Sequence, residues 1–366
     1  MALFLGTAAD ETITSGGVSG SVTVLPAGGP RLPGLSSDVI YAGGGNDTID
    51  GGAGSNPAED YRGMPNLLLG GQGDDSITVR AGDRAEGGTG NDTFVVRANS
   101  FLNLGPAAPG ARIDGGEGVD TLQAPVQLFR RQGGLGNGDI SELSLTGVER
   151  LELQVHSRLL LTAGQLDGFD TVNVPTNLLP FFPVSLVLTT SGKAQADIAG
   201  TGALIVTAAD GDDTLLLRAT GPSPISLRID GGAGNDRIVT GAGDDSLQGG
   251  AGDDILNAGH GNDTLVGGAG RDRMAGGAGD DTFVFAPGTL GLGNATDHIV
   301  DFQGAGRAGG DVLRLDGFGE GATLRLAGSL PHSLAYEVVG GDGVALGRLL
   351  VSSGGVALAA GDYLFT

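Results

Sequence analysis

The stretch GGAGNDRIVTGAGDDSLQGGAGDDILNAGHGNDTLVGGAGRDRMAGGAGDDTFV, residues 231–284, decides the fold of this chain. It consists of six consecutive nine-residue units without an insertion, and each unit places an aspartate at its sixth position. The shared pattern is G-G-x-G-x-D-x-U-x, in which U is apolar, and this pattern is a signature of a calcium-binding parallel β-helix. The six aspartates are Asp236, Asp245, Asp254, Asp263, Asp272 and Asp281.

Each unit reads as a tight turn followed by a short strand. The segments after the aspartates are too brief for helices and carry an apolar residue at a fixed offset, which indicates strands. Glycine turns a chain sharply without a side-chain clash, so backbone carbonyls can converge at the corner. The glycines at positions 2 and 4 are therefore candidate contributors to a metal site. They are Gly232, Gly234, Gly241, Gly243, Gly250, Gly252, Gly259, Gly261, Gly268 and Gly270.

Carboxylates and carbonyls at such a corner suit a hard cation. Ca²⁺ takes six to eight oxygen ligands at about 2.3–2.6 Å. Zinc or copper would call for thiolate or imidazole, and the chain has no cysteine and only four histidines. We therefore expect several Ca²⁺ ions as the cofactor, with the position-6 aspartates as their side-chain ligands.

Two units make one coil of the expected solenoid, so aspartates eighteen residues apart should stack at about 4.8 Å along its axis. The predicted stacked pairs are Asp236 with Asp254, Asp245 with Asp263, Asp254 with Asp272, and Asp263 with Asp281. Residues 231–284 contain nine acidic residues and three arginines, a net charge of −6. Carboxylates at this density repel one another, so metal binding and folding should be one event.

Further copies of the unit are dispersed through the chain. They add Asp47, Asp75, Asp92, Asp120 and Asp213 as candidate metal ligands. The spacings from Asp47 to Asp120 are irregular, which predicts that the stacking is interrupted there and that these sites are fewer or weaker. A broken copy at 51–59 has Asn56 in the aspartate position and Pro57 where the strand should begin, so we expect no full-strength ion there.

The composition fits an acidic solenoid. Glycine accounts for 72 of 366 residues, and the formal net charge is −23. Such a chain is not expected to bind nucleic acid or an anionic membrane surface through bulk electrostatics. No run of eighteen apolar residues predicts a transmembrane segment, and no N-terminal export signal is visible. Extracellular calcium modules bind at about 10⁻⁴–10⁻³ M, so folding is expected outside the cell.

The six tandem units resemble the RTX, or hemolysin-type, repeats of bacterial type I secreted proteins. Residues 279–289 and 297–318 are similar to the segment after the repeats in serralysin-type proteins, and the end at 362–366 resembles an uncleaved C-terminal secretion signal. The resemblance implies a type I secretion apparatus as partner and an extracellular or cell-surface location.

The expected fold is all-β: a parallel β-roll or β-solenoid with calcium-binding glycine-rich turns, interrupted by loops and closed by a C-terminal β cap. We expect four parts: an N-terminal solenoid with dispersed repeats, a calcium-poor β-rich segment, the tandem β-roll, and a C-terminal cap with the secretion signal. Their bounds are 1–123, 124–207, 208–285 and 286–366. The segment 124–207 either continues the solenoid or is a small ligand-binding insert, and both alternatives stay open here.

Enzyme motifs are missing from the sequence. There is no H-E-x-x-H and no G-x-S-x-G, and the many G-x-G-x-x-G matches lack a βαβ context. We expect a non-enzymatic secreted structural or surface protein that self-associates or contacts a surface or matrix polysaccharide. The alternatives are a polysaccharide-active enzyme or glycan-binding adhesin using 124–207, and a soluble export partner or signalling protein.

Several polar residues near the repeats are not expected to hold metal. The position-5 acids Asp244, Asp253 and Asp280 should face solvent, since Asn and Arg replace them in other units. His260 should be an exposed turn residue. His298 should be a polar residue at the start of a strand in the cap.

Overall fold

The computed structural model describes residues 2–14, 17–25, 38–52, 65–80, 82–96, 110–123, 137–154, 158–175, 184–220, 225–291, 296–304 and 310–366. The broken repeat with Asn56 and Pro57, and Val155 in the calcium-poor segment, lie outside these residues. The backbone forms two compact units, Met1–Val184 (unit 1) and Ser185–Thr366 (unit 2). The four-part division expected from the sequence stays a prediction.

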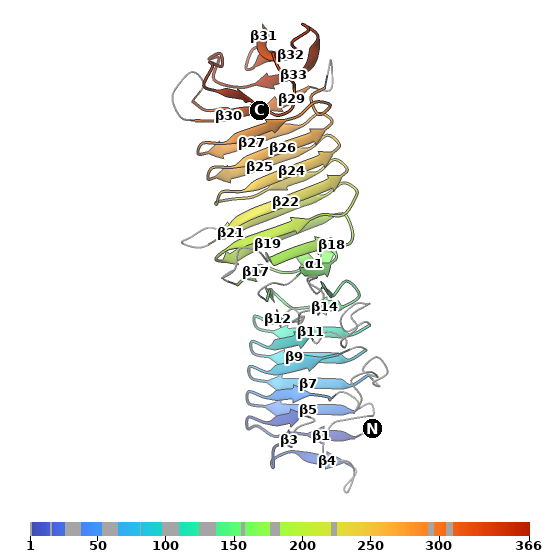
Figure 1. Ribbon diagram of the computed structural model, residues 1–366. Coiled ribbons are helices and arrows are strands. Elements are labelled where there is room, and N and C mark those ends of the chain that lie inside the picture. Colours follow the sequence, from blue (N-terminus) through green and yellow to red (C-terminus); the bar gives the residue numbers. More distant parts are fainter. Residues whose placement is uncertain are drawn as a thin grey trace. The chain divides into compact units, whose positions relative to one another are not determined.

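Most of the short strands of unit 1 stack in two sheets, and nearly all of their neighbours run parallel (Figure 1). Its first sheet contains, in stacking order, β4 (Thr23–Leu25), β1 (Leu3–Leu5), β5 (Val39–Gly44), β7 (Leu67–Gln72), β9 (Arg84–Thr89), β11 (Arg112–Glu117) and β14 (Ser144–Thr146). Its second sheet contains β3 (Gly17–Val18), β2 (Thr12–Thr14), β6 (Thr48–Asp50), β8 (Ser76–Val79), β10 (Thr93–Val96), β12 (Thr121–Gln123), β15 (Arg150–Glu152) and β17 (Thr171–Val174). The first coil is covered by antiparallel strands, since β4 pairs with β1 and β3 pairs with β2.

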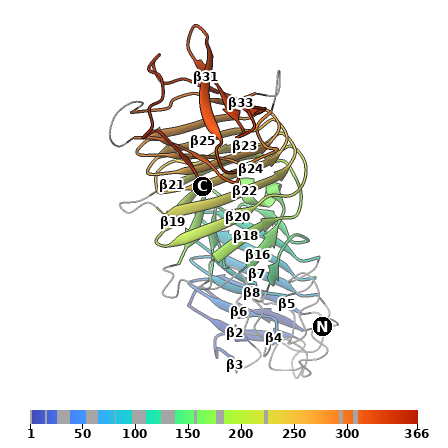
Figure 2. The same cartoon turned by 45° about the horizontal axis from the view of Figure 1, so that its top comes forward.

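Unit 2 repeats the two-sheet stack with longer strands. One sheet contains β20 (Ala203–Thr207), β22 (Ser226–Ala233), β24 (Ser246–Ala251), β26 (Thr264–Ala269), β28 (Thr282–Phe285), β30 (Val312–Leu315) and β34 (Tyr363–Phe365). The other contains β19 (Lys193–Gly200), β21 (Thr214–Thr220), β23 (Arg237–Val239), β25 (Ile255–His260), β27 (Arg273–Ala278) and β29 (Asp297–Ile299). Figure 2 shows the strands of this unit stacked coil upon coil. The all-β parallel roll expected from the repeats is therefore confirmed.

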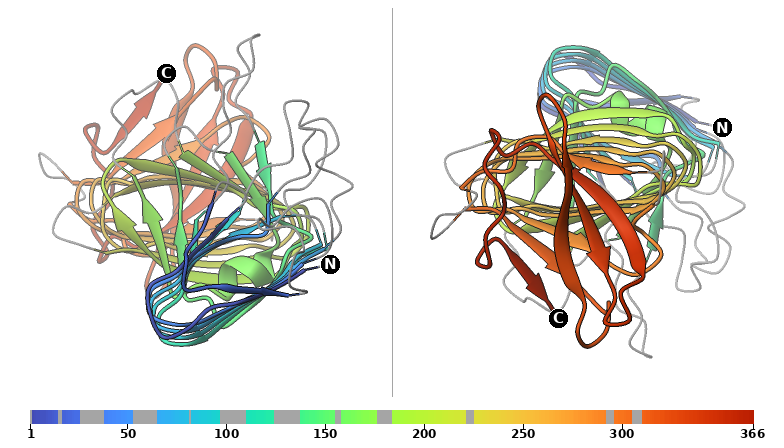
Figure 3. Two further views of the ribbon diagram at one scale, coloured as in Figure 1. Left: turned by 90° about the horizontal axis from the view of Figure 1, so that it is seen from below. Right: turned by 90° about the horizontal axis from the view of Figure 1, so that it is seen from above.

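A C-terminal β structure completes unit 2. β33 (Ala345–Val351) pairs in parallel with β29, and it continues into an antiparallel sheet with β32 (Leu334–Val339) and β31 (Thr323–Ser329). These strands lie beside the last coil of the array in the right-hand view of Figure 3. The residues resembling a secretion signal form β34, which lies beside β30 at the edge of its sheet.

The interior of each unit contains rows of apolar side chains, in which each coil contributes one residue to a row. In unit 1, Ile49, Ile77, Phe94, Leu122 and Leu151 lie opposite one another in register and are fully buried. In unit 2, the corresponding row consists of Leu215, Ile238, Leu256, Met274 and Ile299. Each apolar residue of the nonapeptide therefore packs on its equivalent in the next coil, as expected of a solenoid.

The dispersed repeats of unit 1 stack without interruption, which corrects the expectation drawn from their irregular spacing. Ile49 lies opposite Ile77 and Ile77 lies opposite Phe94, although the aspartates of these turns are 28 and 17 residues apart. The extra residues fall between the second sheet and the next strand of the first sheet, so the glycine turn itself keeps its length. Insertions at the turn that leads back to the first sheet therefore do not change the register of the glycine turns at the opposite edge of the coils.

The described part of the calcium-poor segment continues the parallel pairing. β14 extends the ladder of β11, β15 extends that of β12, and β13 (Asn137–Asp139) pairs in parallel with β16 (Arg158–Leu161). A single turn of helix, α1 (Ala163–Asp167), begins at Thr162 with a capping box. The Gln165 side chain donates hydrogen bonds to the carbonyls of Ile140 and Leu143, so an amide group satisfies backbone carbonyls of this segment. β18 (Val184–Leu188) follows.

Candidate metal centre

The position-6 aspartates are tied to one another by hydrogen bonds between coils. The N–H of Asp236 donates to Oδ1 of Asp254 at 2.8 Å, and the N–H of Asp254 donates to Oδ1 of Asp272 at 3.0 Å. The N–H of Asp245 binds Asp263 in the same way, and that of Asp263 binds Asp281. All four stacked pairs expected from the 18-residue spacing therefore exist, and we call each such row an inner ladder.

Both inner ladders of unit 2 are longer than the tandem repeats. The first runs through Asp213, Asp236, Asp254, Asp272 and Asp297, and the second runs through Asp245, Asp263, Asp281 and Asp311. Asp297 and Asp311 lie outside the nonapeptide units and were not among the predicted ligands. Oδ2 of Asp297 has no donor among the described residues, whereas Oδ2 of Asp311 accepts the N–H of Gln303. Both side chains are buried, and Asp297 precedes the buried Ile299 by two residues, as in the repeat. That Asp-x-apolar spacing is the signal that could have found them.

Unit 1 has one inner ladder of the same kind. It contains Glu11, Asp47, Asp75, Asp92, Asp120 and Glu149, with each backbone N–H donating to the carboxylate of the following member. The structure thus brings together all the dispersed aspartates predicted for this unit, and it adds a glutamate at each end. Glu11 precedes the buried Ile13 by two residues, which is again the repeat spacing.

Each predicted aspartate keeps one oxygen without a hydrogen-bond donor. Oδ1 accepts the backbone N–H, whereas Oδ2 is buried and accepts no hydrogen bond from the described residues. This holds for Asp47, Asp75, Asp92, Asp120, Asp213, Asp236, Asp245, Asp254, Asp263, Asp272 and Asp281, as well as for Asp297 and for Oε2 of Glu11. A buried carboxylate oxygen without a partner is costly, so a row of them points to a cation as the missing partner.

A backbone carbonyl of the next coil faces the same space as this oxygen. A methyl group placed on Gly231 would stand 2.5 Å from Oδ2 of Asp236 and 2.6 Å from the carbonyl oxygen of Gly249. The same convergence of carboxylate and carbonyl occurs beside Gly249, Gly70, Gly87 and Gly115. These position-1 glycines were not among the predicted residues, although the Gly-Gly doublet of the repeat marks them. At these five glycines the space leaves no room for a side chain, whereas position 1 is Thr240 or Ala258 in the units of Asp245 and Asp263.

The glycines at positions 2 and 4 serve the stacking of the turns. Gly250 has a φ of 117°, and a Cβ there would overlap the carbonyl oxygen of Gly232 in the preceding coil. Nine of the ten predicted glycines share this left-handed backbone, and Gly241 is the exception. The turn of Gly241 is the first in its ladder. A Cβ on Gly241 would make only ordinary contacts with Arg218, so no glycine corner of a preceding coil requires a left-handed backbone there.

Burial and mutual repulsion raise the pKa values of the ladder carboxylates. Burial raises the pKa of Asp75 to about 7, and the neighbouring carboxylates of Asp92 and Asp47 add to the effect. Burial likewise raises the pKa of Asp254 to about 6 and that of Asp263 to about 7, again with help from the adjacent ladder members. Without a cation, the ladders hold negative charge only at a cost in free energy.

The donor set fits Ca²⁺ and does not fit a soft metal. No three His, Cys, Asp or Glu side chains gather into a metal site among the residues that the structure describes. Ions in the turns must therefore be held by aspartates from successive coils together with backbone carbonyls. Hard oxygen donors of this kind are the ligands that Ca²⁺ prefers. Bound Ca²⁺ would supply positive charge to the ladder, and the chain's own part is to hold the oxygens in place.

The position-5 side chains form a second, outer row on the turns. Asp253, Asp244 and Asp280 are exposed, as expected. Their row also has a structural role, because the N–H of Arg271 donates to Asp253 and the N–H of Asp253 donates to Asn235. The outer row therefore links coils through carboxylate and amide groups in the direction opposite to the inner ladder.

The side chains of His260 and His298 are not members of the inner ladders, although His298 directly follows the ladder residue Asp297. His260 is exposed in its turn, and its carbonyl accepts the N–H of Gly243. His298 lies in β29, where its Nε2 is 2.9 Å from Oγ of Ser352 and 3.1 Å from Oγ of Ser333. Burial, and then the charge of Arg273, lower the pKa of His298.

Comparison with known proteins identifies the repeats. The sequence profile of the RTX calcium-binding nonapeptide repeat (4 copies) matches residues 34–56, 230–265 and 261–289. No curated protein matches the chain. Proteins with these repeats are typically secreted, and the family is associated with type I secretion. No helix in the described ranges has the length and apolar character needed to cross a membrane. The chain therefore carries hemolysin-type RTX repeats that bind Ca²⁺ in their turns and build a parallel β-roll.

Proposed function

We propose that this chain is a secreted, non-enzymatic structural or surface-associated protein whose β-roll folds when it meets extracellular Ca²⁺. The observation that carries the proposal is the row of buried Oδ2 atoms in the inner ladders, each without a hydrogen-bond donor among the described residues. At neutral pH and above, such a row is tolerated in a stable fold only if cations neutralise it. The ligands we assign are the position-6 aspartates with the position-1 carbonyls of the adjacent coil.

Electrostatics make folding depend on the ion. Two unit charges about 5 Å apart repel by about 3 kcal/mol at an effective dielectric constant of 20. A ladder of five carboxylates contains several such pairs, and a protein is stable by only about 5–15 kcal/mol. The calcium-free chain at neutral pH is therefore expected to be unfolded across the tandem turns. Low calcium inside a cell would keep the chain unfolded for export, and millimolar calcium outside would fold it.

Far-ultraviolet circular dichroism during a calcium titration tests coupled folding. The β signal of the full chain should appear with calcium and disappear with a chelator. Magnesium at the same concentration serves as the control, because it demands a smaller octahedral site and should not substitute. An unchanged β signal in chelator would contradict the proposal.

A structural role, rather than an enzymatic one, is supported by the regular stacking. The described strands of 137–175 pair in parallel with their neighbours. Light scattering and electron microscopy during calcium addition test assembly. Sheets or filaments would support a matrix or surface-layer role, and a persistent monomer would favour a soluble role.

A further inference from the structure

One row of outward-facing side chains in unit 2 contains two arginines and no acid, although the chain as a whole has a net charge of −23. On the sheet of β19 to β29, Arg237 lies opposite Ile255, Ile255 opposite Arg273, and Arg273 opposite His298. These residues follow the ladder aspartates directly and point away from the core. In an acidic protein, such a concentration of cationic side chains on one sheet calls for a reason.

The repeat GGAGRDRMA is the source of the unusual charge. It places Arg271 at position 5, where the other tandem units have Asn or Asp, and Arg273 at position 7. Arg271 pairs with Asp253 at 3.4 Å, and both side chains are exposed. Arg273 is exposed and forms no ion pair with any acid in the described part of the chain. Its charge acts on Asp301 and His298, but no hydrogen bond within the described part of the chain occupies its guanidinium N–H groups, which can therefore donate to a ligand.

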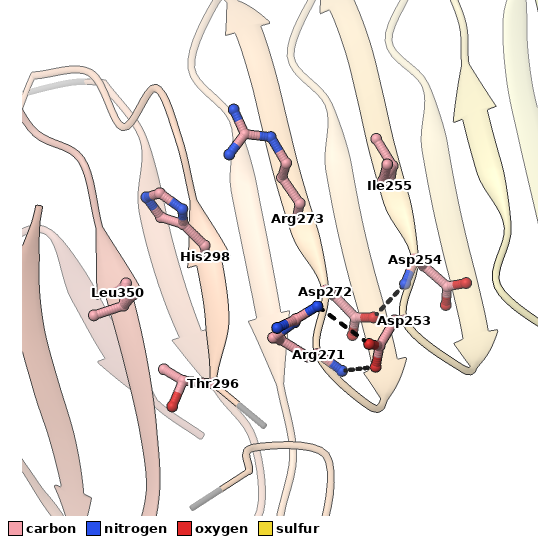
Figure 4. Close-up of a pocket in the computed structure, with 9 residues that line it drawn as sticks. All are labelled: Asp253, Asp254, Ile255, Arg271, Asp272, Arg273, Thr296, His298 and Leu350. Atoms are coloured by element: carbon pink, nitrogen blue, oxygen red, sulfur yellow. Dashed lines mark hydrogen bonds and ion pairs between the residues drawn. The ribbon is translucent and has the colours of Figure 1, made fainter. Parts of the chain in front are cut away.

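These side chains surround a surface cavity of about 360 Å³. Its cationic and polar lining includes Arg271, Arg273 and His298, and its apolar lining is Ile255 and Leu350. Figure 4 shows Arg273 and His298 on adjacent strands, with Arg271 at the turn below them. Ile255 is 39% exposed, which is unusual for a large aliphatic side chain on a face of the roll. The volume falls within the range of about 300–1,000 Å³ that is usual for ligand pockets.

We propose that this cavity binds a carboxylated sugar residue of an extracellular polysaccharide. Arg273 would bind the carboxylate, Arg271 would exchange its exposed pairing with Asp253 for a contact with the ligand, and Ile255 and Leu350 would pack against the apolar face of the ring. An Arg guanidinium matches a carboxylate in a bidentate geometry. The aliphatic side chains favour a ligand that has an apolar surface beside its charge, which inorganic anions lack.

The charge of the whole protein narrows the ligand class further. A densely charged polyanion such as a nucleic acid would be repelled by the acidic surface around the cavity. A polymer with one carboxylate per disaccharide carries far less charge than a nucleic acid, and it can place a single sugar residue in the cavity. The position of the cavity on the outer face of the sheet leaves room for the polymer on either side of the bound sugar.

The cavity is coupled to the calcium ladder. Its acidic lining consists of Asp253, Asp254 and Asp272, and the latter two are members of the inner ladder. Cations on the ladder would cancel the charges of Asp254 and Asp272, so the local field would favour an anion only in the calcium-loaded protein. The proposed binding of the sugar carboxylate therefore rests on the proposed binding of calcium to the ladder.

Isothermal titration calorimetry on the calcium-loaded full chain tests the site. The probe is a tetrasaccharide of alternating glucuronate and N-acetylglucosamine, and the neutral chitin tetrasaccharide and free glucuronate are the comparisons. The acidic tetrasaccharide should bind in a saturable way, free glucuronate more weakly, and the neutral one not at all. Arg273→Gln should weaken binding at least about tenfold, because it removes a charge-assisted hydrogen bond, and Arg273→Lys should restore part of the affinity.

Arg237→Gln is the matched control. Arg237 occupies the same repeat position and follows a ladder aspartate, but it does not line the cavity. It lies two strands from Arg273, about one Debye length away, so its loss should change affinity by less than about twofold. Equal losses in the two variants, equal binding of the neutral sugar, or no binding would each overturn the proposal. Circular dichroism of the same samples reports calcium-dependent folding separately, so a failure of the sugar site is distinguishable from a failure of the folding proposal.

Discussion

Unit 1 and unit 2 are built from the same turn but use it differently. Unit 2 carries inner ladders on both edges of its roll, headed by Asp213 and Asp245. Unit 1 carries one inner ladder, and its opposite edge holds the row Asp38, Asn66 and Asp83. Asp83 in that row accepts hydrogen bonds on both oxygens, from the N–H groups of Asn66 and Arg80. An aspartate that starts a strand therefore offers an oxygen to a cation only where no nearby N–H group donates to its second oxygen.

The difference shows what tandem repetition adds. Unit 1 tolerates insertions because they fall at the edge without glycine corners, and its single ladder stays in register. Unit 2 has nine-residue units at both edges in its tandem part, so neither edge can lengthen without breaking a ladder. We expect unit 2 to depend on calcium along both edges and unit 1 along one edge. The following predictions test this contrast.

Removal of calcium should have the largest effect. Each ion held at about 100 times its dissociation constant adds about 2.7 kcal/mol, a factor of about one hundred. Hydrogen exchange of the full chain in chelator should therefore lose protection by at least about a hundredfold across 231–284. The edge of unit 1 with Asp38 and Asp83 should keep more of its protection. An equal loss of hydrogen-exchange protection at every strand would contradict the expected difference in calcium dependence between unit 1 and unit 2.

The calcium-free protein should be more stable in mild acid. The folded pKa values of Asp236 and Asp254 are about 6 and those of Asp263 and Asp297 about 7, above the ordinary 3.8. Protonation therefore stabilises the fold fully below about pH 4, and this stabilisation is lost as pH rises through 6 to 7. In chelator, circular dichroism should show more β structure at pH 5 than at pH 8. The reverse order would contradict the raised pKa values.

A methyl group at Gly249 should occupy the space between the carboxylate and the carbonyl of one calcium site. Gly249→Ala puts a Cβ between Oδ2 of Asp254 and the carbonyl of Gly267, at a residue whose φ is not positive. The calcium concentration at half-folding should rise by on the order of tenfold. Gly87→Ala makes the same change in unit 1 and should have a smaller effect on unit 2. Gly328→Ala has open space around its Cβ and serves as the control.

Asp75→Asn and Asp83→Asn should separate a metal ligand from a structural aspartate. Asp75 has a buried oxygen without a donor, whereas both oxygens of Asp83 accept hydrogen bonds. Asp75→Asn should raise the calcium requirement of unit 1 several-fold. Asp83→Asn should lower stability by about 1 kcal/mol and leave the calcium midpoint unchanged. Differential scanning calorimetry across a calcium series measures both effects.

Substitutions in the outer row of position-5 residues should have the smallest effect on the calcium concentration needed for folding. Asp253→Asn keeps an oxygen that can accept the N–H of Arg271, and it removes only an exposed ion pair. Exposed pairs contribute about 0–1 kcal/mol. The calcium midpoint should therefore move by less than about threefold. A shift as large as that of Gly249→Ala would make the position-5 residues part of the metal site.

Much of the fold followed from local sequence, because the nonapeptide carries its own turn, strand and core residue. The 18-residue stacking of Asp236 with Asp254 was predictable for that reason. The continuous ladder of unit 1 was not, because spacing along the chain hides that the insertions lie at one edge. Asp297, Asp311 and Glu11 were missed because no complete G-G-x-G corner precedes them, and the spacing of an acid two residues before an apolar residue is a weak signal by itself. The convergence of backbone carbonyls at the glycine corners was expected from the sequence, but which carbonyl faces each Oδ2 depends on how the next coil stacks.

The sequence alone determined the metal, the turn and the all-β character, since glycine corners, oxygen ligands and a period of nine residues are local properties. The tertiary structure alone decided which oxygens remain free. Whether Asp83 or Asp75 has an unsatisfied oxygen depends on the backbone N–H groups that adjacent coils bring to it. The cavity lined by Arg271 and Arg273 is likewise a tertiary feature, because Arg271, Ile255 and Leu350 are distant in sequence and meet only when successive coils and the cap strand stack in register.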